Sequence, residues 1–279
     1  MTPIFMRFPG GRTKALTLSY DDGVEQDIRL IEILNRYGLK ATFNLNSHYP
    51  VEDITYPDGT IHRRMPRSRA TEVYTNSGHE VAVHTYDHPW LNVLSPTNIT
   101  FEVLKDREEL ETQFGRIVRG MAYPYGRYND TIVDCLRACG IVYSRTTVST
   151  EKFDIPTDWL RMPATCHHKN PRLTELADKF LTMTVKDSPA LFYLWGHSYE
   201  FEADDNWHVI EDFAARMGGK EDIWYATNME IYEYVTAYRN LVFSADCKTV
   251  YNPSSLIIWA KTTAGNIKIE PGQTLRLYN

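Results

Sequence analysis

The stretch Lys14-Ala-Leu-Thr-Leu-Ser-Tyr-Asp-Asp-Gly23 decides how this 279-residue chain is expected to fold. Leucines alternate with Thr17 and Ser19, a period of two that predicts a strand, and an Asp-Asp-Gly turn signal follows at once. Two carboxylates therefore stand where a strand ends. Neighbouring side chains of an extended chain point in opposite directions, so Asp21 and Asp22 are expected to take different tasks. One can ligate a cation while the other stays free as a base.

Strands and helices are expected to alternate after this point. Apolar residues at Ile28, Ile31 and Leu34 predict a helix that Gly38 stops, and residues 41–46 predict the next strand. The same alternation recurs along the chain, with helices expected at residues 69–77, 96–114 and 129–138 and strands at residues 80–84, 117–122, 141–143 and 191–194. Repeated strand–helix units imply parallel strands in an α/β fold.

The pattern changes from Leu241 onward, where short strand-like runs replace the alternation. We expect residues 1–240 to form one α/β domain and residues 241–279 to form a short strand-rich extension packed on it. Residues 50–67 contain few aliphatic side chains and are expected to form a loop over the site.

Composition bounds the function. A chain that is 43% hydrophobic and 24% charged suits one large domain with a buried core. A net charge of -6 argues against a nonspecific nucleic-acid binder, which needs a basic surface. The four cysteines have no zinc-finger spacing, so reduced thiols are expected. No stretch resembles a signal peptide or membrane span, which favours a cytoplasmic location, or a secreted one if a leader was removed.

The histidines His84 and His88 are four residues apart, so one helical or 3₁₀-like turn would bring both imidazoles to the same side. Together with one aspartate they make a His₂Asp set, which leaves coordination positions open for water, as catalytic zinc requires. A bound divalent ion lowers the pKa of its water toward about 7. Asp21 then fits the base that takes the water proton, and His197 fits the acid that protonates the leaving group.

The order and spacing of these residues resemble the motifs of the polysaccharide deacetylases of carbohydrate esterase family 4, the nodulation-type deacetylase homology domain. The family's Thr-Phe-Asp-Asp-Gly motif appears as Ser19-Tyr-Asp-Asp-Gly23, and its His-Thr/Ser-x-x-His motif appears as His84-Thr-Tyr-Asp-His88. Its Arg-x-Pro-Tyr-Gly motif appears as Ala122-Tyr-Pro-Tyr-Gly126, and its Leu-x-x-His motif appears as Leu194-Trp-Gly-His197. The resemblance covers residues 14 to 240 and implies a distorted (β/α)7-type barrel whose site lies at the carboxyl ends of the strands.

The resemblance also implies a role for each motif residue. It makes Asp21 the catalytic base and His197 the acid, and it makes Asp22, His84 and His88 the metal ligands. We expect zinc, although cobalt, nickel, manganese or iron could occupy such a set. No separate organic cofactor is expected.

The substrate groove is inferred from the same resemblance. The backbone N–H of Tyr125 is expected to help hold the oxyanion, a contribution typically worth about 3 kcal/mol of the barrier. Pro124, Leu194 and Trp195 are expected to line the groove. The family's fourth motif pairs an Asp with a Trp that walls the groove, and the nearest match is Asp158-Trp159.

One departure from the family pattern concerns the base. The family's arginine, which holds the base carboxylate, is replaced by Ala122. An unpaired aspartate would titrate differently from an ion-paired one, so we expect another cation to substitute, with Arg161 as the candidate. We also consider Asp154 beside Asp158 as the acid that orients His197.

The sequence thus predicts a metal-dependent carbohydrate deacetylase that releases acetate from an N-acetylated or O-acetylated oligo- or polysaccharide. Short N-acetylated oligosaccharides are ranked slightly above O-acetylated ones. Two alternatives stay open: a carbohydrate-binding pseudoenzyme that lost turnover with the change to Ala122, and a metal hydrolase that acts on a non-acetyl amide.

Overall fold

The computed structural model describes residues 4–49 and 56–278. Its centre is a nine-stranded sheet in which every pair of neighbours is parallel, as the strand–helix alternation predicts. The strand order is β7-β6-β5-β4-β3-β2-β9-β8, and β10 also pairs with β2. The strands are β2 (Lys14–Asp21), β3 (Ala41–Leu45), β4 (Glu80–Val83), β5 (Gly120–Ala122), β6 (Tyr143–Ser149), β7 (Met162–Ala164), β8 (Cys166–His167), β9 (Ala190–Gly196) and β10 (Ile223–Tyr225).

The two edges of this sheet are joined by one stretch of chain. Strands β7 and β8 are separated only by Thr165 yet stand at opposite ends of the strand order. Met162 of β7 pairs with Arg145 of β6, and Cys166 of β8 pairs with Leu194 of β9. One continuous stretch thus pairs with β6 through β7 and with β9 through β8, which closes the sheet into a distorted barrel. The expected fold class is confirmed.

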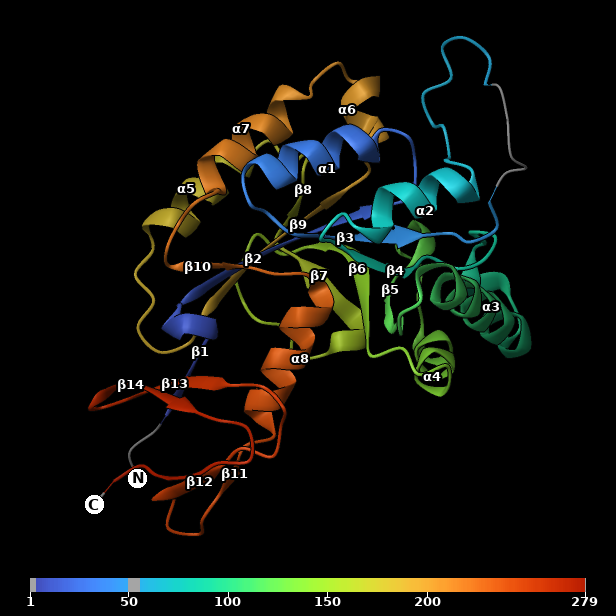
Figure 1. Ribbon diagram of the computed structural model, residues 1–279. Helices are drawn as coiled ribbons and strands as arrows, with labels where there is room; N and C mark the ends of the chain where they lie inside the picture. Colours follow the sequence, from blue (N-terminus) through green and yellow to red (C-terminus); the bar gives the residue numbers. More distant parts are fainter. Residues whose placement is uncertain (1–3, 50–55, 279) are drawn as a thin grey trace.

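Eight α-helices in the described part of the chain surround the barrel (Figure 1). Figure 1 shows α1, α5 and α7 side by side, and α2 and α4 each beside α3. The α-helices are α1 (Asp27–Arg36), α2 (Arg67–Thr75), α3 (Pro96–Phe114), α4 (Asp130–Ala138), α5 (Leu173–Thr182), α6 (Tyr199–Ala203), α7 (His208–Met217) and α8 (Asn228–Arg239), and the 3₁₀ turns are η1 (Pro9–Gly11), η2 (Leu91–Val93), η3 (Pro124–Gly126) and η4 (Trp159–Arg161). Among the described residues, no helix is long and apolar enough to cross a bilayer.

Helix ends follow local chemistry. The helix expected at residues 96–114 has those bounds because Ser95 caps it by accepting a hydrogen bond from the Asn98 N–H, and Gly115 ends it in the left-handed conformation. The helix expected at residues 69–77 lies two residues earlier, since it follows Pro66 and ends before Asn76. Such shifts are usual for element boundaries read from sequence.

The strand-rich C-terminal region is present as two small antiparallel sheets. One contains β1 (Phe5–Arg7), β13 (Ile258–Thr262) and β14 (Gly265–Ile269), and the other contains β11 (Val242–Phe243), β12 (Thr249–Tyr251) and β15 (Thr274–Arg276). Val250, Ile258 and Ile269 are fully buried in a cluster shared with Tyr234 of α8. Because the N-terminal β1 joins the same sheet as β13, the region packs on both β1 and α8 (Figure 1). The domain division at residue 240 stays a prediction.

Candidate active site

The candidate residues lie at one end of the barrel. Strand β2 ends at Asp21, β4 is followed by His84, β5 ends at Ala122 and β9 is followed by His197. Because these strands are parallel, their carboxyl ends meet at the same end of the barrel. Four separate stretches of sequence therefore converge on one place.

Asp22, His84 and His88 form the first candidate metal site. The Nε2 atoms of the two histidines are 3.2 Å apart, and each is 3.7 Å from Oδ1 of Asp22. Zinc bonds to such ligands are about 2.0–2.2 Å long, which puts tetrahedral donor atoms about 3.3 Å from one another. The donor set therefore fits one small divalent ion.

The backbone that builds this site differs from the expected one. Asp22, Thr85 and His88 have positive φ angles of 82°, 69° and 55°. The left-handed turn at Asp22 brings its carboxylate to the same side as that of Asp21, and both lie within 4 Å of the His84 imidazole. The expectation that the two aspartates point apart is wrong, because only an extended backbone alternates its side chains. The two histidines are likewise joined by an irregular turn and not by a helical one.

His84 is held with one nitrogen available. Its Nδ1 lies 2.8 Å from the carbonyl oxygen of Ala122, which leaves Nε2 free to face Asp22. Its backbone N–H donates to Asp106, whose carboxylate also accepts from the Ser47 N–H. Burial lowers the pKa of His84, and burial together with His84 lowers the pKa of His88 to about 4. Both rings are therefore neutral near pH 7, as metal ligands must be.

Asp21 is buried and ion-paired. Its Oδ1 accepts a hydrogen bond from the Asn44 side chain at 2.8 Å, and its Oδ2 accepts one from Arg145. Burial raises the pKa of Asp21, but Arg145, His84 and His197 outweigh that effect and hold the pKa below its usual value. Asp21 is therefore ionised and ready to accept a proton.

The cation beside Asp21 comes from a neighbouring strand. Arg145 lies on β6 directly opposite Ala122 of β5, the position where the related motif has its arginine. The guanidinium is fully buried and also lies 4.4 Å from the Trp195 ring centre. Arg145 on β6 thus provides the positive charge that the motif arginine would provide from the paired position on β5.

Arg161, the cation expected at this place, is located elsewhere. It pairs with Asp158 at 2.6 Å and with Asp130 at 2.7 Å, on the partly exposed turn η4. The expectation was wrong because Asp158 and Arg161 are three residues apart and satisfy each other locally. Trp159 packs edge-on against Tyr232, and among the described residues no hydrogen bond or ring contact joins it to His197. These contacts therefore do not support the expected role of Trp159 as a wall of the substrate groove.

The carboxylate that contacts His197 is Glu200, which none of the four sequence motifs indicates. The His197 Nδ1 lies 3.2 Å from Glu200 Oε2, and its Nε2 lies 3.8 Å from Asp21. Burial lowers the pKa of His197, but the hydrogen bond to Glu200 and the nearby aspartates outweigh this and raise it. Neither Asp158 nor Asp154 makes this contact. The His-x-x-Glu spacing at the start of α6 was the available signal.

The remaining groove candidates divide into two groups. Tyr125 is exposed, and its ring packs edge-on against His88 at 4.5 Å and Trp90 at 5.8 Å. Trp195 is mostly covered by its neighbours. Pro124 and Leu194 are buried, so their expected contact with substrate is wrong. Their positions are filled by core packing, which sequence spacing alone does not reveal.

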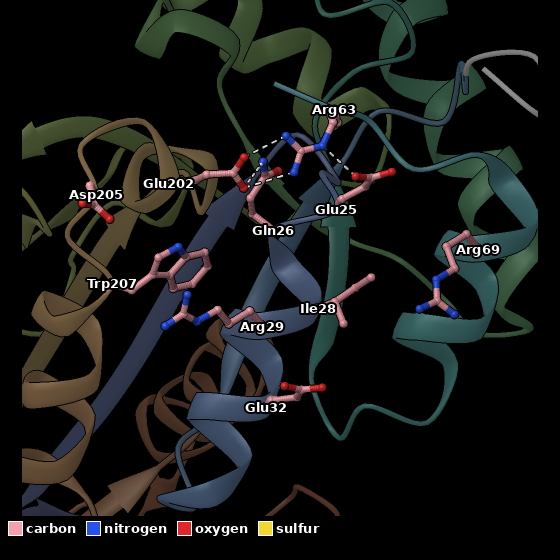
Figure 2. Close-up of a pocket in the computed structure, with 10 residues that line it drawn as sticks. All are labelled: Glu25, Gln26, Ile28, Arg29, Glu32, Arg63, Arg69, Glu202, Asp205 and Trp207. Atoms are coloured by element: carbon pink, nitrogen blue, oxygen red, sulfur yellow. Dashed lines mark hydrogen bonds and ion pairs between the residues drawn. The ribbon is translucent and has the colours of Figure 1, made fainter. Parts of the chain in front are cut away.

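The segment from residue 56 to 66 lies against the site, while residues 50–55 of the expected loop are outside the described residues. His62 of this segment places Nε2 3.2 Å from Asp22 Oδ2. Arg63 anchors the segment by donating to both Glu202 and Glu25, and Figure 2 shows these ion pairs at the edge of a groove of about 790 Å³. Gln26 also donates to Glu202. The network fixes His62 next to the candidate ligand.

Part of the chain is similar to a known protein family. Residues 9–144 match the family model described as polysaccharide deacetylase. Residues 9–144 of the chain belong to the polysaccharide deacetylase family. The chain is 25% identical over 140 residues to the peptidoglycan-N-acetylglucosamine deacetylase PgdA of Listeria monocytogenes, a match that covers 50% of this chain and 26% of that protein. The chain thus spans about a quarter of the curated relative's length.

Solved structures of polysaccharide deacetylase family proteins share the fold. A polysaccharide-deacetylase-type protein from Mycobacterium smegmatis has a TM-score of 0.59 at 17% identity, with 86% of this chain and 96% of that chain covered. The family 4 carbohydrate esterase from Streptomyces lividans has a TM-score of 0.50 at 15% identity, with 76% and 91% covered. At these identities the likeness establishes the fold.

Proposed function

We propose that this polysaccharide deacetylase family member is a metal-dependent carbohydrate deacetylase. It would hydrolyse an acetyl group from an N-acetylated or O-acetylated oligo- or polysaccharide and release acetate. One observation carries the proposal: three metal donors lie beside a buried, ion-paired Asp21 and a His197 held by Glu200. The residues proposed as ligand set, base and acid thus lie within one site.

The metal centre would be formed by Asp22, His84 and His88. Two nitrogens and one carboxylate oxygen suit zinc best among the divalent ions considered, although cobalt, nickel, manganese and iron accept the same donors. When bound, such an ion acts as a Lewis acid on the acyl oxygen and makes a water molecule more acidic.

The protein's own groups would move the protons. Asp21 accepts the proton of the attacking water, and its ionised form is maintained by Arg145 and Asn44. Nε2 of His197 lies 3.8 Å from Asp21 Oδ2, and His197 carries the proton for the departing amine or alcohol, with Glu200 favouring its charged form. Tyr125 would provide its backbone N–H to the developing oxyanion, and its exposed ring would border the acetylated sugar.

Arg145 bears on the pseudoenzyme alternative. That hypothesis rested on the loss of an arginine at Ala122, and Arg145 now provides a cation to the same carboxylate. The non-acetyl amide alternative keeps the same chemistry with another acyl group. We continue to rank N-acetylated oligosaccharides slightly first, and a cytoplasmic location stays a prediction.

The test is acetate release from N-acetylated and O-acetylated oligosaccharides by zinc-loaded protein. Asp21→Asn, which keeps the shape of the side chain, serves as the matched control. We expect wild-type release from one of the two substrate sets and a loss of about 100-fold or more in the variant, because the base is removed. Equal release by both proteins would refute the assigned mechanism. No release from either set, with formyl or imide substrates hydrolysed instead, would favour the non-acetyl alternative.

A further inference from the structure

A second cluster of metal-binding side chains lies beside His197. Oxygen Oε2 of Glu200 is 3.1 Å from Nε2 of His167, 3.2 Å from Nδ1 of His197 and 3.3 Å from Nε2 of His168. Three imidazole rings thus surround one carboxylate oxygen. None of these contacts involves Asp22, His84 or His88, so the cluster is distinct from the first ligand set.

The fold builds this cluster from three elements. His167 ends β8, His197 follows the neighbouring β9, and Glu200 lies in the first turn of α6. The absence of a side chain at Gly196 is required here, because a Cβ at that residue would lie 2.0 Å from Nδ1 of His168. Gly196 therefore leaves the space that allows the His168 imidazole to pack close to β9.

The spacing of the donors suits a small divalent ion. Donor atoms of His167, His197 and Glu200 all lie within 4.8 Å of one another, and the two printed nitrogen–oxygen distances are near the value of about 3.3 Å expected around tetrahedral zinc. All three side chains are partly exposed, at 20%, 24% and 16%, so an ion can reach them from solvent. Lys169 contacts the other oxygen, Oε1, whereas Oε2 faces the imidazoles and also accepts a hydrogen bond from the His197 backbone N–H.

His168 is an independent sign of a ligand here. Its side chain is only 1% exposed, and among the described residues neither ring nitrogen has a hydrogen-bond partner, although Nε2 faces Glu200. Buried polar groups in proteins are nearly always partnered. An ion bound to Glu200 would give this imidazole a function, either as a further donor or as the group that fixes the ligating carboxylate.

We propose that His167, His197 and Glu200 bind a second divalent transition-metal ion, and that this ion inhibits the enzyme. Binding would place the ion on Nδ1 of His197, in exchange for the proton that faces Glu200. The displaced proton would pass to solvent, and the neutral ring, left with only its Nε2 proton, could no longer act as the imidazolium acid. The inhibitory part rests on the proposed deacetylase function, whereas the binding part does not.

The second site should bind its ion more weakly than the first. Its donors are more exposed, and the ammonium of Lys169 lies 3.2 Å from the same carboxylate. Occupancy would therefore follow free metal concentration, with the first ion supporting turnover and the second suppressing it.

Zinc titration of metal-free protein tests the binding. We expect two zinc ions per wild-type chain, one per chain for His167→Gln, and loss of the tighter ion alone for Asp22→Asn. Thermal unfolding of each variant checks the fold, and Glu200→Gln is a second variant that should also lose the weaker ion. One zinc per wild-type chain, or an unchanged second ion in both His167→Gln and Glu200→Gln, would overturn the site.

Acetate release during the same titration tests the inhibition. Wild-type release should rise with the first equivalent and fall by about 100-fold when the second site is full, the scale of a lost general acid. His167→Gln should retain its rate at the same excess of zinc. Equal inhibition of both proteins would contradict the inhibitory role. Two bound ions without acetate release from either protein would instead count against the proposed function and leave the site standing.

Discussion

Arg145 contacts Asp21 from the strand next to the one that carries the related motif. The contact is fully buried and places the positive charge on the carboxylate oxygen that also faces His84 and His197. Removal of either partner of a buried salt bridge strongly destabilises the folded protein, because it leaves an uncompensated buried charge. Arg145 therefore acts as a positioning residue for the proposed base.

Arg145→Ala should strongly impair acetate release and should change its pH dependence. The arginine lowers the pKa of Asp21, so its removal raises that pKa and moves the acidic limb of the rate profile to higher pH. Unfolding free energy should fall by about 3–5 kcal/mol. Rate–pH profiles and urea unfolding measure these effects. Arg145→Lys should recover part of the activity and part of the stability.

Arg161→Ala is the matched control for that experiment. Its ion pairs with Asp158 and Asp130 lie on a partly exposed turn, and such pairs contribute about 0–1 kcal/mol. We expect an unchanged rate–pH profile and a small loss of stability. A shifted acidic limb in this variant, with none in Arg145→Ala, would contradict the assignment of Arg145.

The difference between these two arginines shows what the sequence could and could not predict. Motif spacing located Asp21, Asp22, His84 and His88 because those residues lie on or beside strands whose ends follow from hydrophobic periodicity. Arg145 depends instead on the register between β5 and β6, which no local pattern encodes. Alignment of the two strand ends would have placed it beside Ala122.

Backbone conformation set a second limit on prediction. The left-handed turn at Asp22 is an exception to ordinary L-residue preferences, and it is maintained by the surrounding structure. The prediction assumed an extended backbone, in which side chains alternate, and so it gave the wrong direction for the Asp22 carboxylate. Glu200 was missed for a different reason, because its role depends on a helical first turn directly after His197.

Glu200→Gln should move the alkaline limb of the rate profile to lower pH. Glu200 helps to raise the pKa of His197, so a neutral glutamine lowers that pKa and the ring loses its proton earlier as pH rises. Asp158→Asn is the control, since Asp158 contacts Arg161 and Leu160 and not His197. The comparison is made at one zinc equivalent. An unchanged alkaline limb in Glu200→Gln would show that another group sets the charge of His197.

Removal of metal should abolish acetate release, and zinc should restore it. His84→Ala should lose both the tight zinc ion and activity, because it removes a nitrogen from the ligand set formed by Asp22, His84 and His88. His208→Ala, at an exposed position at the start of α7, is the control. Chelation followed by zinc titration measures both properties. Full activity of the chelated wild-type protein would exclude the proposed metal dependence.

Asp27 should make the stability of the protein depend on pH. Tyr74 and Ser198 donate hydrogen bonds to its buried carboxylate at 2.5 and 2.6 Å, yet burial raises the pKa of Asp27 to about 7, above its ordinary value of 3.8. The folded chain then keeps a proton that the unfolded chain releases, so stability falls by up to about 1.4 kcal/mol per pH unit as pH rises from about 4 to 7. Above pH 7 both states are ionised and this contribution stays constant.

Asp27→Asn should remove that part of the pH dependence, because the amide does not titrate. Urea unfolding at pH 5, 6 and 7 would then show a shallower decline in the variant than in wild type, by about one proton's contribution. Asp106, whose pKa burial also raises to about 7, should leave a remaining slope in both proteins. Parallel stability curves for the variant and wild type would mean that Asp27 is already ionised in the folded chain at pH 5.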